Sequence, residues 1–334
     1  MDHLSRRQFL QGVGVAGLAL LAGCGRLPWQ GQAPKPPRLG ALLWLGAQGP
    51  SSTALLQGLR DLGYAEDHNL TLEWRAHQGR ADLLPQLVAE LVQLPVDVIY
   101  TSGTPAALAA SEGTRTTPIV MTAVGDPVAV GLVTSLGRPG GNVTGTANLA
   151  PQLSGKRLEL LKDVMPGLSR VGVLVNAAIT DKALDLRETQ EAARTLGVSL
   201  SPAPVREAGE FESAFAAMAR ERVDALVVLE DFMFFAPPHR GQLVALAAQH
   251  GLPTMYTLRE WVDAGGLMAY GPNLVDAHRR SASYIDRILK GTKPADLPVE
   301  QPREFEFVIN LKTAQALGLT IPEHVLLQAT EVLQ

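Results

Sequence analysis

Short apolar runs alternate with amphipathic segments along the chain from residue 39 onward. This alternation is typical of parallel strands joined by crossover helices. The expected strands of the first half are 39–45, 70–75, 96–100 and 118–121, and the expected helices are 53–62, 83–94 and 104–111. The same order begins again in the second half, with strands at 171–175, 198–205, 223–229 and 253–256 and helices at 184–196, 211–220 and 243–250.

The two halves also have the same residues at the starts of corresponding strands. Each reaches its third strand through a Val-Asp pair and its fourth through a proline (Val96, Asp97 and Pro118; Val223, Asp224 and Pro253). A repeat of this kind predicts an α/β protein with two doubly wound parallel-sheet lobes. Open sheets of this class bind ligands at the carboxyl ends of their strands, so we expect a cleft shared by the two lobes.

The expected seam between the lobes lies near residues 148–154, before a helix at 156–164. A helix at 276–290, a strand at 305–309 and a short helix at 312–317 follow the second half, and their periodicity alone does not assign them to a lobe. We expect an N-terminal lobe of residues 39–149 plus about 269–298. The C-terminal lobe is then 150–268 plus about 303–334, and hinge crossings join the two.

The N-terminus has the features of an export signal. Arg6 and Arg7 precede an uncharged stretch at 12–22 that is shorter than the roughly 20 residues of a membrane-spanning helix. Adjacent arginines are typical of the twin-arginine (Tat) route, with general secretion as the alternative. The residues before Cys24 read Leu-Ala-Gly and resemble a bacterial lipobox, so residues 1–24 are expected to be a lipoprotein signal peptide. Lipid on Cys24 would then anchor the protein to a membrane through a flexible tether at 25–38.

Composition excludes several classes of function. A net charge of −4 gives no electrostatic reason to expect binding of nucleic acid. Cys24 is the single cysteine, and the seven histidines lack the spacing of a metal site, so we expect neither metal nor cofactor. Because the chain also lacks a G-x-S-x-G nucleophile motif, we expect no catalytic residues and no enzyme activity.

Eight segments together carry a family resemblance. They are 102–107 (SGTPAA), 124–128 (VGDPV), 138–145 (RPGGNVTG), 153–161 (LSGKRLELL), 264–267 (AGGL), 270–272 (YGP), 310–314 (NLKTA) and 317–322 (LGLTIP). In combination they resemble the ABC transporter substrate-binding protein family that includes the tryptophan/tyrosine-type periplasmic binding proteins. The resemblance implies a type I periplasmic-binding-protein fold, a hinge-bending clamp and no catalysis.

Two departures from the family pattern fall at expected strand ends. The family often has Asn-Pro after the strand at 171–175, whereas here Asn176 is followed by Ala177. It often has Pro-Asp-Pro after Leu229, where this chain has Glu230, Asp231 and Phe232. Since both positions face the expected cleft, the ligand can differ from that of other members.

Polar residues at the strand ends are candidates for binding a small ligand. Ser102 and Thr104 surround the start of a helix, where free N–H groups can bind a carboxylate, although either residue can also be an ordinary N-cap. Asp126 follows the fourth strand and is a candidate partner for an ammonium group, or alternatively an ordinary turn residue. Asn176 and Asp231 are the corresponding candidates in the second lobe.

Aromatic residues near the strand ends are candidates for a wall against an apolar ligand side chain. The candidates are Trp44, Tyr256 and Tyr270, and core packing is the alternative for each; Phe232 lies near a strand end as well. Because Arg and Lys are scarce at these strand ends, phosphate and sulfate are disfavoured. The sequence therefore predicts a zwitterionic ligand, an aromatic or branched amino acid.

Taken with the resemblance, these features predict an extracytoplasmic, lipid-anchored solute-binding protein of an ABC importer. Its partners would be the small-molecule ligand and the permease and ATPase subunits, and we expect the protein itself to be a monomer. The alternative is the ligand-binding subunit of an extracytoplasmic sensor for a signalling kinase, because the clamp chemistry would be identical.

Overall fold

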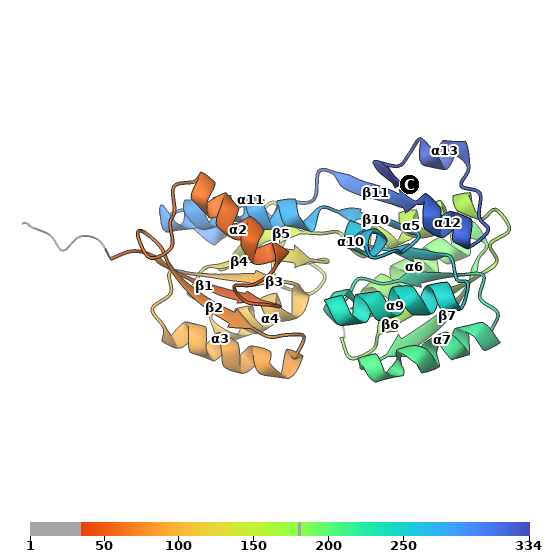
Figure 1. Cartoon of the computed structure of the whole chain (residues 1–334). Coiled ribbons are helices and arrows are strands. Elements are labelled where there is room, and N and C mark those ends of the chain that lie inside the picture. Colours follow the sequence, from red (N-terminus) through yellow and green to blue (C-terminus); the bar gives the residue numbers. More distant parts are fainter. Residues whose placement is uncertain (1–34, 180–181) are drawn as a thin grey trace, which may run out of the picture. The chain divides into compact units, whose positions relative to one another are not determined.

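The computed structural model describes residues 35–179 and 182–334. The expected signal peptide, Cys24 and all but the last four residues of the expected tether lie outside the described residues. Within the described part, the strands form two separate sheets, each covered by helices on both faces (Figure 1).

The first sheet has the order β2-β1-β3-β4-β5, and the printed pairings of these described strands are all parallel. The strands are β1 (Arg38–Leu43), β2 (Thr71–Ala76), β3 (Val98–Ser102), β4 (Ile119–Val124) and β5 (Val143–Ala147). The helices of this lobe are α2 (Pro50–Asp61), α3 (Leu84–Gln93), α4 (Thr104–Gly113) and α11 (Leu274–Leu289), with 3-10 turns η1 (Ala81–Leu83) and η3 (Pro294–Asp296).

Alternation along β1 divides the core of this lobe into two layers. Leu39 and Leu43 pack with buried residues of α2 and α11, whereas Leu42 packs with α3 and α4 on the other face. Helix α11 lies against α2 at Gly58, where a Cβ atom would come 2.2 Å from the carbonyl oxygen of Arg279. Helix α11, which follows ten described strands in the sequence, is thus part of the N-terminal lobe (Figure 1).

The second sheet has the order β12-β11-β10-β9-β8-β6-β7. Its strands are β6 (Arg170–Asn176), β7 (Ser199–Val205), β8 (Ala225–Val228), β9 (Thr254–Tyr256), β10 (Met268–Pro272), β11 (Phe305–Asn310) and β12 (Glu331–Leu333). The pair β10–β11 is antiparallel and the other printed pairs are parallel. The helices are α5 (Ser154–Val164), α6 (Lys182–Leu196), α7 (Phe211–Arg220), α8 (Phe232–Phe235), α9 (Pro237–Gln249), α10 (Arg259–Asp263), α12 (Leu311–Ala316) and α13 (Glu323–Leu326), with the turn η2 (Ala208–Glu210).

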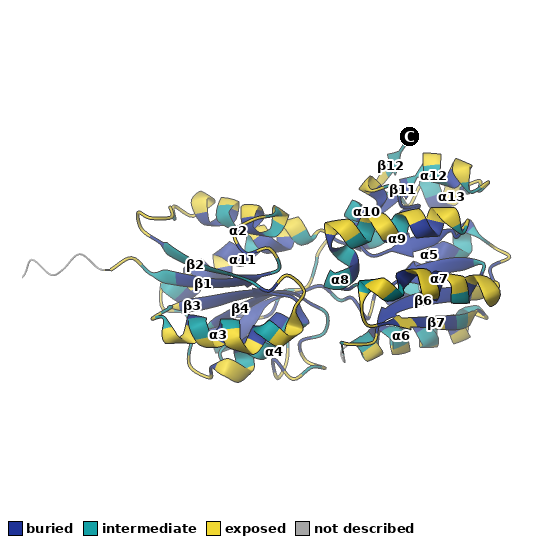
Figure 2. Ribbon diagram, turned by 60° about the horizontal axis from the view of Figure 1, so that its bottom comes forward, coloured by how far each residue is buried: buried dark blue, intermediate teal, exposed yellow. Residues whose placement is uncertain are grey.

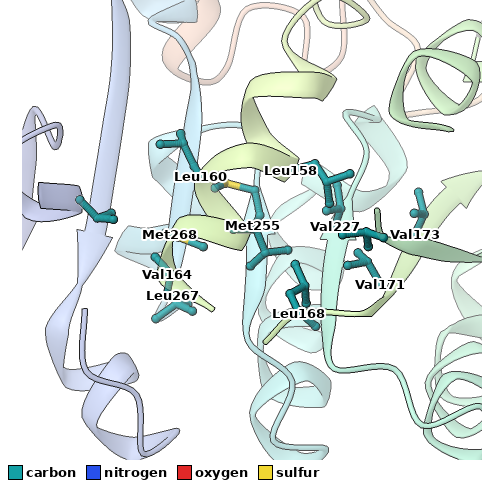
Figure 3. Close-up of a cluster of buried hydrophobic side chains, with 14 of the residues drawn as sticks. Leu158, Leu160, Val164, Leu168, Val171, Val173, Val227, Met255, Leu267 and Met268 are labelled. Atoms are coloured by element: carbon teal, nitrogen blue, oxygen red, sulfur yellow. The ribbon is translucent and has the colours of Figure 1, made fainter. Parts of the chain in front are cut away.

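The core of the second lobe also has two layers. Leu158 and Val164 of α5 belong with Val171 and Val173 of β6 to one buried cluster on one face of the sheet (Figure 3). Leu174 points to the other face and joins the cluster formed with α7 and α9. The strands are buried between these layers, and exposed residues lie on the outer faces of the helices (Figure 2). Burial on both faces explains the nearly continuous apolar runs of the sequence.

The described chain passes between the two sheets three times: after β5, after β10 and after the β-bridge that pairs Glu300 with Thr146. The structure places residues 269–272 in the second sheet, whereas the sequence analysis assigned them to the first lobe. They belong there because β10 pairs along five residues of β11. The second crossing therefore follows Pro272, and α11 is the part of the tail that returns to the first lobe.

Candidate functional site

A pocket of about 270 Å³ lies where the carboxyl ends of the two sheets meet. From the first lobe it is lined by Trp44 after β1 and by Ser102 and Thr104 around the start of α4. From the second lobe it is lined by Asn176 at the end of β6 and by Asp231 after β8. Five of the eight candidate ligand-binding residues therefore line this one pocket.

Two helices of the first lobe begin at the pocket. The residues before and within the first turns of α2 and α4 line it, and neither helix start has a side-chain cap hydrogen bond. Gly103 precedes α4 with φ 86° and ψ 155°, a conformation that is essentially restricted to glycine. Backbone N–H groups in the first turn have no intrahelical acceptor, and they carry the positive end of the helix dipole. These two helix starts can therefore bind an anionic group without a charged side chain.

An aromatic cluster joins the two lobes beside these helix starts. The ring of Phe232, from the second lobe, stacks on Trp44 with centroids 5.7 Å apart and meets His77 edge-on at 6.3 Å. Its Cε2 atom also lies 2.1 Å from the position that a Cβ atom would take at Gly103. Phe232 therefore packs directly on the backbone at the start of α4, and the absence of a side chain at Gly103 is what permits this contact.

The polar residues of the second lobe hold one another in place. Asn176 Nδ2 donates to Asp231 Oδ1 at 3.0 Å, and the backbone N–H of Met233 donates to the same oxygen at 2.8 Å. Asp231 thus caps α8, and the next residue, Phe232, contacts Trp44 of the first lobe. Next to it, Glu230 Oε1 accepts a hydrogen bond of 2.6 Å from Asn148, which lies in the first crossing between the sheets.

Three buried polar atoms that line the pocket have no hydrogen-bond partner in the described part of the chain: His77 Nε2, Glu230 Oε2 and Trp261 Nε1. Buried polar groups are normally paired, because leaving one unpaired costs about 1–3 kcal/mol. All three atoms belong to residues of one pocket, where a polar ligand can supply the missing hydrogen bonds.

Burial keeps the histidines of the pocket neutral. His77 and His278 are 5% and 2% exposed, and burial lowers the pKa of each to about 4. His278 Nδ1 is hydrogen-bonded to the hydroxyl of Tyr100 at 2.5 Å. Since the pocket residues contributed by the first lobe include no Asp, Glu, Lys or Arg among those described, the first-lobe wall carries no charge at neutral pH.

The structure places three of the sequence candidates away from the pocket wall. The carboxylate of Asp126 accepts from the backbone N–H groups of Val128 and Ala129 and from Gln152, as a turn residue does. Tyr256 is 1% exposed and stacks on Trp261 at 4.7 Å. Tyr270 stacks on Phe305 at 5.8 Å within the second sheet.

Sequence reasoning missed several residues that line the pocket. His77 follows a strand without any motif, and His278 comes from a helix whose lobe the periodicity did not assign. Glu230 was named as a departure from the family pattern at a strand end facing the expected cleft, but it was not chosen as a binding candidate. Phe232 was noted as an aromatic residue near a strand end, but nothing in the sequence indicated its contact with Gly103.

Among the described residues, no group of three or more His, Cys, Asp or Glu side chains is arranged to bind a metal ion. In the same part of the chain, no helix is both long enough and apolar enough to cross a membrane.

Comparison with known proteins places this architecture in a family. The family model for ABC transporter substrate binding proteins matches residues 50–333. Over 316 residues the chain is 25% identical to the tyrosine-binding protein of Clostridioides difficile (strain R20291), a match that covers 92% of this chain and 90% of that protein.

Two solved structures share the fold at higher identity. A conserved domain protein from Vibrio cholerae is 30% identical with a TM-score of 0.83, covering 89% of this chain and 100% of that one. An ABC domain from Streptococcus pneumoniae, solved in complex with L-Trp, is 28% identical with a TM-score of 0.82, covering 90% of this chain and 100% of that one. With two doubly wound lobes of the type I periplasmic-binding-protein fold and a family match over most of its length, this chain belongs to the ABC transporter substrate-binding protein family.

Proposed function

We propose that this protein binds an aromatic or branched amino acid between its lobes and delivers it to the permease and ATPase subunits of an ABC importer. The observation that carries the proposal is the composition of the pocket wall. Two uncapped helix starts lie on one side, an aromatic cluster lies beside them, and carboxylates lie on the other side. A zwitterion with an apolar side chain needs these three surfaces.

The size of the pocket also favours a small ligand. A volume of about 270 Å³ is just below the range of about 300–1,000 Å³ that is usual for ligand pockets. The relatives support the same class of ligand, because one is a tyrosine-binding protein and another was solved in complex with L-Trp. In this proposal the ligand carboxylate lies at the starts of α2 and α4, and Trp44 contacts the ligand side chain.

The proposal includes export and anchoring. The twin arginines and the lipobox-like sequence before Cys24 support a lipoprotein that is held at a membrane by its acylated cysteine and works outside the cytoplasm. A monomer is sufficient for this role, because both walls of the pocket come from one chain. Hinge bending at the three crossings would close the lobes, and the ligand favours the closed form by its higher affinity for it.

Thermal unfolding of the full chain with a panel of amino acids, nucleosides, sugars and small acids tests the proposed ligand class. A ligand present at about a hundred times its dissociation constant adds about 2.7 kcal/mol to the free energy of unfolding. We expect a rise in the unfolding temperature with aromatic or branched amino acids. A response confined to sugars or nucleosides would retain a binding protein and refute the amino-acid ligand.

A further inference from the structure

Glu230 lines the pocket, and one of its two carboxylate oxygens has no hydrogen-bond partner among the described residues. It follows β8 directly and lines the pocket next to Asp231. Its Oε1 is hydrogen-bonded to Asn148 at 2.6 Å, which fixes the side chain. Its Oε2 is buried and has no hydrogen-bond partner among the described residues. A buried carboxylate oxygen without a partner is costly, and a cation that donates hydrogen bonds removes the cost.

The nearby cations bind other groups, and Nη2 of Arg157 is buried without a hydrogen-bond partner in the described part of the chain. Arg157 donates to the carbonyl oxygens of Tyr270 and Ala150 at 2.8 and 3.2 Å, and Lys182 forms an ion pair with Asp185 at 3.4 Å. Within the described chain, neither of them forms an ion pair with Glu230. Burial raises the pKa of Glu230, while the charges of Lys182 and Arg157 partly oppose the rise. The carboxylate therefore still lacks a direct counter-ion.

The distribution of charges on the pocket wall also favours a positive ligand group near the second lobe. The described lining residues include two cations and three carboxylates (Lys182 and Arg240; Glu230, Asp231 and Glu260). All five come from the second lobe, whereas the first-lobe wall carries neutral side chains and two helix starts. A ligand with its positive group toward the second lobe and its negative group toward the first would balance this arrangement.

From these observations we infer that Glu230 Oε2 accepts a hydrogen bond from the α-ammonium group of the bound amino acid. The inference rests on the proposed function, and it assigns to Glu230 the recognition that the sequence analysis sought at Asp126. The hydrogen bond to Asn148 holds the carboxylate at the first crossing, where the lobes are joined.

Glu230→Gln tests the inference, because glutamine keeps the shape and can still accept from Asn148 but carries no charge. The ligands are L-tyrosine and 3-(4-hydroxyphenyl)propionate, which differ by the ammonium group, titrated into the full chain by calorimetry. We expect the variant to lose affinity for L-tyrosine by about tenfold to a hundredfold and to bind the desamino compound as the unchanged protein does. Glu159→Gln removes a carboxylate outside the pocket, on the exposed face of α5, and should leave the discrimination between the two compounds intact.

Equal affinity of Glu230→Gln and the unchanged protein for L-tyrosine would overturn the inference, as would an equal loss of affinity in Glu159→Gln. If Glu230→Gln does not fold, the two ligands are compared on the unchanged protein alone. Equal affinity for the desamino compound and for L-tyrosine would refute any role for a carboxylate in binding the ammonium group. The proposed function fails separately, when the folded, unchanged protein binds no amino acid of the panel.

Discussion

Alanine at position 103 is expected to weaken ligand binding by about tenfold to a hundredfold. Gly103 has φ 86° and ψ 155°, and forcing another residue into this conformation costs about 1–3 kcal/mol. The new Cβ atom would also lie 2.1 Å from Cε2 of Phe232, so the second lobe could not approach the start of α4 as closely. Both effects oppose the arrangement in which the two lobes share a pocket. Calorimetric titration of the full chain measures the loss.

Two matched variants separate the causes. Gly125→Ala adds the same methyl group to another pocket residue, where the nearest atom is 3.5 Å away, and it should bind like the unchanged protein. Adding Phe232→Ala to Gly103→Ala removes the clash but not the backbone strain, and should restore part of the affinity. Unaltered binding by Gly103→Ala would show that the contact between Phe232 and the start of α4 is not part of the ligand-bound form.

Arg157→Met is expected to lower the free energy of unfolding by about 3–6 kcal/mol, because it removes two hydrogen bonds from a charged group and each such bond contributes about 1.5–3 kcal/mol. The guanidinium is 1% exposed. It donates to Tyr270, in β10 just before the second crossing, and to Ala150, just after the first. Methionine fills a similar volume but donates to neither carbonyl oxygen, and within the described chain Ala150 then keeps only the 3.4 Å hydrogen bond from the Ser154 hydroxyl. It also removes the positive charge that opposes the raised pKa of Glu230.

Urea denaturation of the full chain measures this effect, with Lys156→Met as the control. Lys156 is the preceding residue of the same helix, its side chain is 36% exposed, and surface pairs such as the one it forms with Glu159 contribute about 0–1 kcal/mol. If Arg157 supports Glu230 electrostatically, Arg157→Met combined with Glu230→Gln should be less destabilised than the sum of the single variants. Equal stability losses for Arg157→Met and Lys156→Met would contradict the role given to the buried guanidinium.

The fold was largely predictable because each lobe repeats a strong signal. Strands buried on both faces appear as apolar runs, and the duplicated order predicted two doubly wound lobes, as the structure has them. Elements with weaker signals were missed. Strand β5 contains Gly145, where a Cβ atom would lie 2.0 Å from the carbonyl oxygen of Met121, so packing rather than propensity explains it. Helix α9 begins at Pro237, six residues before the expected start, because proline is tolerated in a first helical turn.

The candidate site was predictable where it depends on strand ends alone. Ser102, Thr104, Asn176, Asp231 and Trp44 come together because carboxyl ends of parallel strands share an edge of the sheet. Which side chains face the pocket depends on local turns. Asp126 follows a strand end just as Asp231 does, but its carboxylate accepts from the backbone of its own turn. The contribution of His278 depends on the crossing that returns α11 to the first lobe, which no local pattern encodes.

Calorimetric titration of L-tryptophan and L-tyrosine into the full chain, and into one variant from each wall of the pocket, tests directly whether a ligand binds between the lobes. Trp44→Ala removes an aromatic ring of the first lobe, and Asp231→Asn removes a charge of the second while keeping a residue that can cap α8. Arg187→Ala, on the exposed face of α6, is the control. We expect one saturable site per chain, weakened by both pocket variants and unchanged by the control. Binding that is indifferent to the changes in one of the two lobes would contradict a ligand held between them.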